Sequence, residues 1–270
     1  MPELPDVERF KRLVQQHCVG KIIAKADAVD PESLEGASPA VLQRRLKGKP
    51  LRACCRHGKV LLVEMDDAAT LAMHFGTNGS LQHIARDQPE APYIRLWLVF
   101  ADGDRLAYIN PRRIGRVHFV PDAKAFIAAA GLGPDALDPS FDLAAFAAAL
   151  GDRKQAIKSV LMHQTRTAGI GNIYADEILF QAMLHSGVAA NALGNDAIRR
   201  LFDAMKSVLQ TAIDCGAGAE EFTDRLPKGF LLPERHIGGR CPRCGTPIEA
   251  DKHGRRTGYY CPKCQPAPNG

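Results

Sequence analysis

Apolar residues recur at helical spacing near the start of the chain and at strand-like spacing over the next hundred residues. Within residues 5–19, Val7, Phe10, Val14 and Cys18 fall on one face of a helix. The segments that follow are short, β-like and bounded by Gly, Asp, Asn and Pro clusters: Lys21–Val29, Lys59–Met65, Thr70–Phe75, Tyr93–Phe100, Arg105–Ile109 and Arg116–Val120. A series of short strands separated by turns predicts a β-sandwich or barrel.

The pattern changes near Leu132-Gly133-Pro134-Asp135, where Ala-rich sequence of helical periodicity begins. The helices expected there are Leu143–Leu150, Lys154–His163, Ile173–Ala182 and Asp196–Cys215. A stretch interrupted by Gly and Pro then leads into a Cys-rich tail. We therefore expect three units: an N-terminal β-domain at 1–132, a helical domain at 133–236 and a metal-binding tail at 237–270.

Composition narrows the class of protein only slightly, because 46% hydrophobic and 24% charged residues are typical of globular chains. The net charge is +5, and the segment 225–264 carries nine Lys or Arg against three acids. Such a tail is typical of nucleic-acid binding or of a solvated terminus. No apolar run long enough to span a membrane and no signal peptide are present, so we expect a cytoplasmic protein with reduced cysteines.

The tail contains two CxxC pairs, Cys241–Cys244 and Cys261–Cys264, separated by sixteen residues. Two such turns can supply four thiolates to one tetrahedral Zn²⁺, and a closed four-cysteine site is structural rather than catalytic. Disulfide pairing is the alternative. The residues between the pairs, 248–260, predict a hairpin that carries the basic side chains Lys252, His253, Arg255 and Arg256.

Two further motifs are ambiguous on their own. The segment Gly169-Ile170-Gly171-Asn172 lies between two expected helices, so its residues form either an ordinary turn or a phosphate-binding helix start. Pro2 becomes the first residue once Met1 is removed, and its secondary amine could attack a sugar carbon and form an iminium. Glu3 and Asp6 are nearby carboxylates that could move protons, although Met-Pro-Glu is also a common start.

Taken in order, these motifs resemble the formamidopyrimidine-DNA glycosylase and endonuclease VIII family along the whole chain. The resemblance rests on the PELPDVE start, His57-Gly58-Lys59, the segment from His74-Phe75-Gly76 to Gly79-Ser80-Leu81, Pro111-Arg112-Arg113, GIGNIYADEILF and the terminal CPKCQ. It implies an α+β multidomain fold: a two-layer β-sandwich with flanking helices, a helix-two-turn-helix domain and a Cys₄ zinc finger.

The resemblance also implies a function, namely base-excision repair of duplex DNA by a glycosylase with abasic-site lyase activity. The damaged nucleotide is flipped out, the Pro2 nitrogen attacks C1′ while Glu3 helps to open the sugar, and the iminium supports β- and δ-elimination. A monomer acting on oxidised or ring-opened bases, with one structural zinc ion, is expected.

Matching positions give roles to individual residues. Lys59 corresponds to the family's catalytic-centre lysine and Asp6 to a second carboxylate, shortened here from the usual Glu. His74, Asn172 and Arg256 correspond to residues that bind phosphates around the flipped nucleotide. Arg112 corresponds to the residue that enters the base stack.

Three departures affect the choice of substrate. Thr77 stands where the formamidopyrimidine branch has a void-filling Met, and Ile114 where it has a void-filling Phe. The segment between Ala217 and Cys241 is short and lacks the aromatic-rich loop that caps an oxidised purine. We expect strong activity on abasic sites, moderate activity on ring-opened or pyrimidine lesions, and weak activity on 8-oxoguanine.

Two other classes of protein share some of these features. A catalytically silent DNA-binding protein of the same fold would retain the finger and the glycine turn but would not need Pro2, Glu3 or Lys59. A zinc-ribbon adaptor would not need the N-terminal half of the chain. Covalent trapping on abasic-site DNA with borohydride distinguishes the enzyme from both.

Overall fold

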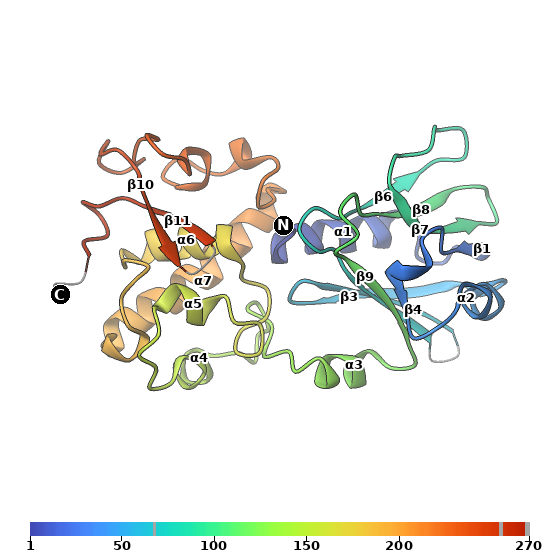
Figure 1. Ribbon diagram of the computed structural model, residues 1–270, viewed down its shortest axis with the longest axis horizontal. Coiled ribbons are helices and arrows are strands. Elements are labelled where there is room, and N and C mark those ends of the chain that lie inside the picture. Colours follow the sequence, from blue (N-terminus) through green and yellow to red (C-terminus); the bar gives the residue numbers. More distant parts are fainter. Residues whose placement is uncertain (67–68, 254–255, 268–270) are drawn as a thin grey trace. The chain divides into compact units, whose positions relative to one another are not determined.

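The computed structural model describes residues 1–66, 69–253 and 256–267, and these residues form three sheets and a set of helices. The chain divides into two compact units, one formed by residues 1–2 and 6–131 and the other by residues 3–5 and 132–270. Each unit is described on its own below (Figure 1). None of the helices in the described ranges has the length and apolar character that a membrane span requires.

The N-terminal unit is built on two sheets. The four-stranded sheet has the order β1-β7-β8-β6 and the five-stranded sheet the order β2-β9-β5-β4-β3, with only β2 and β9 parallel. Their strands are β1 (Ile23–Asp27), β2 (Leu34–Glu35), β3 (Leu51–His57), β4 (Val60–Met65), β5 (Ala69–His74), β6 (Ser80–Ile84), β7 (Ile94–Phe100), β8 (Arg105–Ile109) and β9 (Arg116–Val120). The helices are α1 (Leu4–His17), α2 (Pro39–Leu46) and α3 (Ala123–Ala129), with a 3₁₀ turn η1 at Pro31–Ser33.

Helix α1 places its apolar stripe in the core of this unit. Val7, Phe10, Val14 and Cys18 are all buried, and they belong to the same cluster as inward-facing residues of both sheets. The periodicity therefore predicted both the helix and the face that it buries. The expectation of a two-layer β-sandwich with flanking helices is confirmed.

The prediction missed five strands and helices of this unit: β2, β3, β6, α2 and α3. Strand β3 has Cys, Arg and His among its residues, so its sequence carries no alternating pattern. Helix α2 begins with Ser38, whose hydroxyl accepts a hydrogen bond from the Val41 N–H at 3.3 Å, followed by Pro39 in the first turn. These are helix-start signals that sequence reasoning overlooked.

The C-terminal unit is helical and ends in a two-stranded hairpin. Its helices are α4 (Leu143–Leu150), α5 (Ile157–Leu161), α6 (Asn172–Ala182) and α7 (Asn195–Cys215). The connections contain the 3₁₀ turns η2 (Ala190–Ala192), η3 (Thr223–Arg225) and η4 (Leu232–Glu234). Strand β10 (Glu249–His253) pairs with β11 (Arg256–Tyr260). Helix α5 is shorter than the expected Lys154–His163, because residues 152–155 enter it as a turn and a backbone bridge joins Ala156 to Ala189.

The glycine turn before α6 is sterically required. Gly169 has φ of +118°, and a Cβ at this position would lie 2.5 Å from Cδ1 of Leu4. The Leu4 N–H donates to the Gly169 carbonyl at 3.1 Å, so backbone and side chain meet here with no spare volume. A larger residue must therefore move the start of α1 or the turn.

Replacing Gly169 by Ala is accordingly expected to lower the free energy of unfolding by about 2 kcal/mol, from backbone strain and the clash with Leu4 together. Urea denaturation measures the change. Gly194→Ala is the matched control, because Gly194 is in open space at the start of α7 and its φ of −73° suits Ala. Equal losses in the two variants would contradict this explanation of the glycine turn.

Candidate active site and DNA-binding residues

Lys59 follows Gly58 in the two-residue turn between β3 and β4. His57 pairs with Val60 across the turn, and Gly58 has a φ of +56°, which a turn with glycine at its first central position requires. Lys59 itself is only 8% exposed. The spacing His-Gly-Lys therefore places one lysine at the tip of a hairpin while burying most of its side chain.

The turn that carries Lys59 is braced by α1. Nε of Arg56 donates to Oε2 of Glu8 at 3.1 Å, and the same guanidinium donates from Nη1 to the Gly58 carbonyl at 3.2 Å. Burial alone would raise the pKa of Glu8, but hydrogen bonds and charges from Lys11 and Arg56 lower it below its usual value. Sequence reasoning missed this brace, since nothing in the spacing of Glu8 and Arg56 indicates that they meet.

His74 ends strand β5 and pairs with Val60 on β4, next to Lys59. Desolvation of the ring by the surrounding protein atoms lowers the pKa of His74, and the positive charges of Lys59 and His118 lower it further. The imidazole is therefore neutral at pH 7. Because Nδ1 accepts the Gly76 N–H at 3.3 Å, the ring proton is on Nε2, where it can be donated to an anion.

Glu3 is fully buried at the N-terminus of α6. Its Oε2 accepts the N–H groups of Gly171 and Tyr174 at 2.8 and 3.1 Å, and its Oε1 accepts the Ile173 N–H at 2.9 Å. These are the amides that a helix start leaves without partners, and the helix dipole favours a negative charge there. The carboxylate directly after Pro2 in the sequence thus accepts hydrogen bonds from three backbone N–H groups at the start of α6.

Asn172 and Arg256 come together in the C-terminal unit. Asn172 is the first residue of α6, after Gly171, and its Nδ2 donates to the Thr257 carbonyl at 3.0 Å. Arg256 precedes Thr257 at the start of β11, is exposed, and its Nη1 lies 3.2 Å from Sδ of Met162. Two predicted phosphate binders that are far apart in sequence therefore lie beside one another. Arg255, also predicted at the hairpin tip, falls outside the described residues.

A buried ion pair fastens the hairpin to the helices. Nζ of Lys158 on α5 lies 2.5 Å from Oδ1 of Asp176 on α6, and both side chains are inaccessible. Oδ2 of the same carboxylate accepts hydrogen bonds from Nε of Arg235 at 2.9 Å and from the Tyr259 N–H on β11 at 3.1 Å. Burial is the largest influence on both partners: it lowers the pKa of Lys158 and raises that of Asp176. Sequence reasoning missed this network too.

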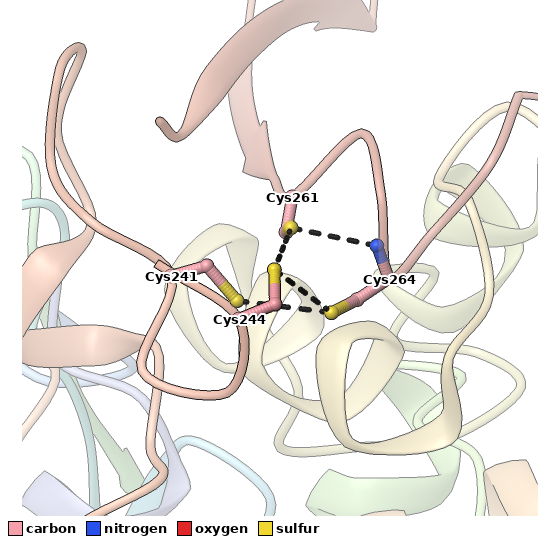
Figure 2. A group of neighbouring side chains, drawn as sticks. All are labelled: Cys241, Cys244, Cys261 and Cys264. Carbon is pink, nitrogen blue, oxygen red and sulfur yellow. Dashed lines mark hydrogen bonds between the residues drawn. The ribbon is translucent and has the colours of Figure 1, made fainter. Parts of the chain in front are cut away.

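The four cysteines of the tail converge on one point (Figure 2). The sulfur atoms are 3.5 Å apart for Cys244 and Cys261, 3.6 Å for Cys244 and Cys264, and 3.8 Å for Cys241 and Cys264. A tetrahedral Zn²⁺ with Zn–S bonds of about 2.3 Å requires sulfur separations of about 3.8 Å. The Cys264 N–H also points at Sγ of Cys261, at 3.4 Å. The donor set and its spacing therefore fit zinc.

The remaining predicted residues lie in the N-terminal unit. Asp6 is buried in the first turn of α1, 3.9 Å from Nη2 of Arg9. Arg112 and Ile114 are exposed in the loop after β8, and Ile114 is 51% exposed although it is apolar. Thr77 is half-buried in the loop after β5, and its hydroxyl has no hydrogen-bond partner among the described residues.

Comparison with known proteins gives one consistent family. The formamidopyrimidine-DNA glycosylase N-terminal domain matches residues 1–117, the H2TH domain of the same enzymes matches 132–224, and the zinc finger found in FPG and IleRS matches 238–267. The zinc-finger match and the sulfur geometry together show that Cys241, Cys244, Cys261 and Cys264 bind one structural zinc ion.

Individual relatives match over nearly the full chain. Formamidopyrimidine-DNA glycosylases of Thiobacillus denitrificans and Geobacter metallireducens are each 35% identical, over 98% of this chain and 100% of theirs. Two structures of the Lactococcus lactis enzyme, one with abasic-site DNA and one a mutant with Fapy-dG DNA, have TM-scores of 0.87 and 0.89. They are 29% and 30% identical and cover 98% of this chain and 100% of theirs.

The order of domains, the cysteine cluster and full-length identity above 30% agree with the resemblance drawn from the motifs. Members of this family are base-excision repair enzymes that act on DNA. The chain belongs to the formamidopyrimidine-DNA glycosylase family.

Proposed function

We propose that this glycosylase acts as a monomer through the Pro2 nitrogen, and that abasic sites and ring-opened bases are its favoured substrates. The observation that carries the proposal is the placement of Glu3. Glu3 directly follows the proposed nucleophile, and three backbone N–H groups hold its fully buried carboxylate in one position. A protein that only binds DNA needs no such group beside its N-terminus.

The chemistry balances with the residues named. The lone pair of the Pro2 nitrogen forms a bond to C1′ of the flipped nucleotide, and the glycosidic bond breaks with its electron pair on the departing base. The proton that the Pro2 nitrogen loses passes to that base, which frees the nitrogen lone pair for the iminium. Opening of the sugar places a proton on O4′, which we assign to Glu3, and leaves an iminium between C1′ and Pro2. Loss of a C2′ proton then expels the 3′ phosphate, and a further elimination expels the 5′ phosphate.

Four residues are assigned to the DNA backbone: Lys59, His74, Asn172 and Arg256. Lys59 and Arg256 bring positive charge, whereas His74 and Asn172 bring neutral N–H donors, since the lowered pKa keeps His74 uncharged at pH 7. The Lactococcus lactis relatives are solved with abasic-site and Fapy-dG DNA, which supports the same partner for this chain. Asp6 is assigned as a second carboxylate for proton transfer.

Covalent trapping tests the nucleophile. Incubation with abasic-site DNA and borohydride is expected to attach the wild-type protein to DNA, and a variant with an uncleaved N-terminal extension is expected not to, because no amine lone pair remains to form the iminium. The same extension at the C-terminus is the control and should trap normally. Full-rate trapping by the N-terminally extended protein would remove Pro2 from the mechanism and leave the DNA-binding alternative or another nucleophile.

Glu3→Gln tests the carboxylate separately. The variant is expected to lose base excision by about a hundredfold, the usual order for a general acid, while nicking of ready-made abasic sites falls much less. Single-turnover rates on the two substrates measure the split. Retained nicking is also the control for folding, and equal loss on both substrates would contradict a role in base release.

Removal of zinc tests the finger. Metal ligation contributes directly to the folding of such small modules, so Cys264→Ala is expected to release the ion and weaken DNA binding on the order of tenfold or more, as Arg256 loses its support. Metal analysis and binding titrations measure both effects. Cys55→Ala, at an exposed cysteine outside the finger, should change neither. Wild-type affinity in the metal-free variant would contradict the role of the finger.

Choice of lesion depends on Thr77 and Ile114. Thr is shorter than the family's Met, Ile lacks a flat face for stacking, and stacking on an aromatic side chain is worth roughly 1–3 kcal/mol per base. We expect 8-oxoguanine opposite cytosine to be excised much more slowly than abasic sites are nicked. The double variant Thr77→Met with Ile114→Phe is expected to raise 8-oxoguanine excision about tenfold.

The same double variant on abasic-site DNA is the internal control, since an abasic nucleotide has no base to unstack and its nicking should stay within about twofold. Matched duplexes under single-turnover conditions give all four rates. If the wild-type protein cuts 8-oxoguanine as fast as an abasic site, Thr77 and Ile114 do not limit the choice of substrate.

A further inference from the structure

Asn110 has a fully buried polar side chain, and the sequence analysis did not identify it as a functional residue. It follows β8 and precedes Pro111 and Arg112. Its Nδ2 donates to the Phe75 carbonyl at 3.0 Å, and its Oδ1 accepts the Ile114 N–H at 3.2 Å. One amide group therefore joins the loop after β5, which carries Thr77, to the loop after β8, which carries Arg112 and Ile114.

Tyr108 extends this connection. It is also fully buried, and its hydroxyl accepts from Nδ2 of Asn110 at 3.2 Å and donates to the His74 carbonyl at 2.7 Å. Burial raises the pKa of Tyr108 to about 12, so the hydroxyl keeps its proton and remains a donor at any working pH. The pair thus holds two consecutive carbonyls of the first loop, those of His74 and Phe75.

Glycines bring the two loops close enough for these bonds. A Cβ at Gly115 would lie 2.2 Å from Nδ2 of Asn110 and 2.0 Å from the Tyr108 hydroxyl, and one at Gly79 would lie 2.7 Å from the same Nδ2. A Cβ at Gly76 would lie 2.7 Å from the Gly115 nitrogen. Neither loop has room to move independently toward the other.

The backbone of Asn110 is anchored to the sheet as well. Its N–H donates to the Tyr93 carbonyl at 3.1 Å, and its carbonyl accepts from Nε of Arg95 at 2.9 Å. Because the Asn110 backbone is fixed in this way, its side chain holds both loops in a defined position relative to β7 and β8. A network in which every polar group is bonded specifies one arrangement, and its partial loss leaves buried groups unpaired.

We propose that Asn110 is a positioning residue that holds the Thr77 loop and the Arg112–Ile114 loop together as a single wedge for the base stack. The proposal rests on the proposed function of these loops in filling the void left by a flipped nucleotide. Asn110 touches no DNA itself. Excision of an intact, stacked base depends on the wedge and hence on Asn110, whereas chemistry on a site that already lacks its base does not.

Asn110→Ala and Tyr108→Phe test the wedge directly. Each protein is mixed in excess with a duplex that contains a stable abasic analogue beside a fluorescent 2-aminopurine, whose emission rises when the stack is opened. Both variants are expected to lose most of the fluorescence change at saturating protein, with Tyr108→Phe the milder because it leaves the Ile114 and Phe75 bonds intact. The analogue is not cleaved, so this readout does not depend on Pro2 chemistry.

Single-turnover rates give the second readout. Asn110→Ala is expected to slow excision of a ring-opened purine roughly tenfold, the usual consequence of leaving buried partners unpaired, while borohydride trapping on abasic-site DNA stays within about twofold. Leu98→Ala is the control for general destabilisation, because Leu98 is buried in the core of the same unit but takes no part in the hydrogen bonds of Asn110 and Tyr108. It should reduce both rates together or neither.

The possible results separate the two proposals. A normal fluorescence change in Asn110→Ala and Tyr108→Phe, or a parallel loss of excision and trapping like that of Leu98→Ala, overturns the role of Asn110. Absence of trapping by the wild-type protein overturns the proposed Pro2 mechanism. The fluorescence comparison still tests the wedge in that case, because it does not depend on Pro2 chemistry.

Discussion

The bond between Glu3 and the first turn of α6 is the interaction on which the rest of the candidate site depends. Three amide groups at a helix start need acceptors, and here one buried carboxylate supplies them. The approach is close enough only because Gly169 has a backbone conformation and a volume that other residues cannot match. The glycine turn, ambiguous in the sequence as either an ordinary turn or a phosphate-binding helix start, thus leads into a helix whose first N–H groups bind a carboxylate of the protein itself. Asn172 beside it is half-buried, and its Nδ2 is bonded to the Thr257 carbonyl.

In the C-terminal unit, the zinc finger is fixed against the helices and supports the hairpin that carries Arg256. Zinc holds the two CxxC turns, but zinc alone does not orient the hairpin against the helices. That orientation comes from the buried pair Lys158 and Asp176, whose carboxylate also accepts the Tyr259 N–H. Burying charges is favourable only where partners surround them, so the network favours one position of the hairpin over others. Arg256 and Asn172 lie side by side as a result.

Residues with a characteristic local pattern were predictable from the sequence, and residues that act through distant contacts were not. The α1 stripe and the CxxC pairs each leave a signal within a few positions. The Glu8–Arg56 brace joins residues 48 positions apart, and the Asn110–Phe75 bond joins residues 35 apart. No spacing rule links such pairs, because their meeting depends on strand register. Strand β3 was missed for a related reason: its polar residues satisfy no alternation, and its pairing with β4 determines its conformation.

The proposed reaction at C1′ and the proposed selection of a base depend on different parts of the molecule. The reaction depends on the N-terminus and the Lys59 turn, and the selection on the loops after β5 and β8. The proposed chemistry uses the Pro2 amine and the Glu3 carboxylate near the N-terminus and the positive charge of Lys59 on the turn between β3 and β4. Selection depends on the free energy of extruding a base, and this energy varies with how well that base stacks. Thr77 and Ile114 lie on loops whose backbones are held by hydrogen bonds from Asn110 and Tyr108. Side chains on such a frame can change without disturbing Glu3 or Lys59, because the frame, rather than the side chains, keeps the loops in place. The range of lesions can therefore differ within this family while the reaction stays the same.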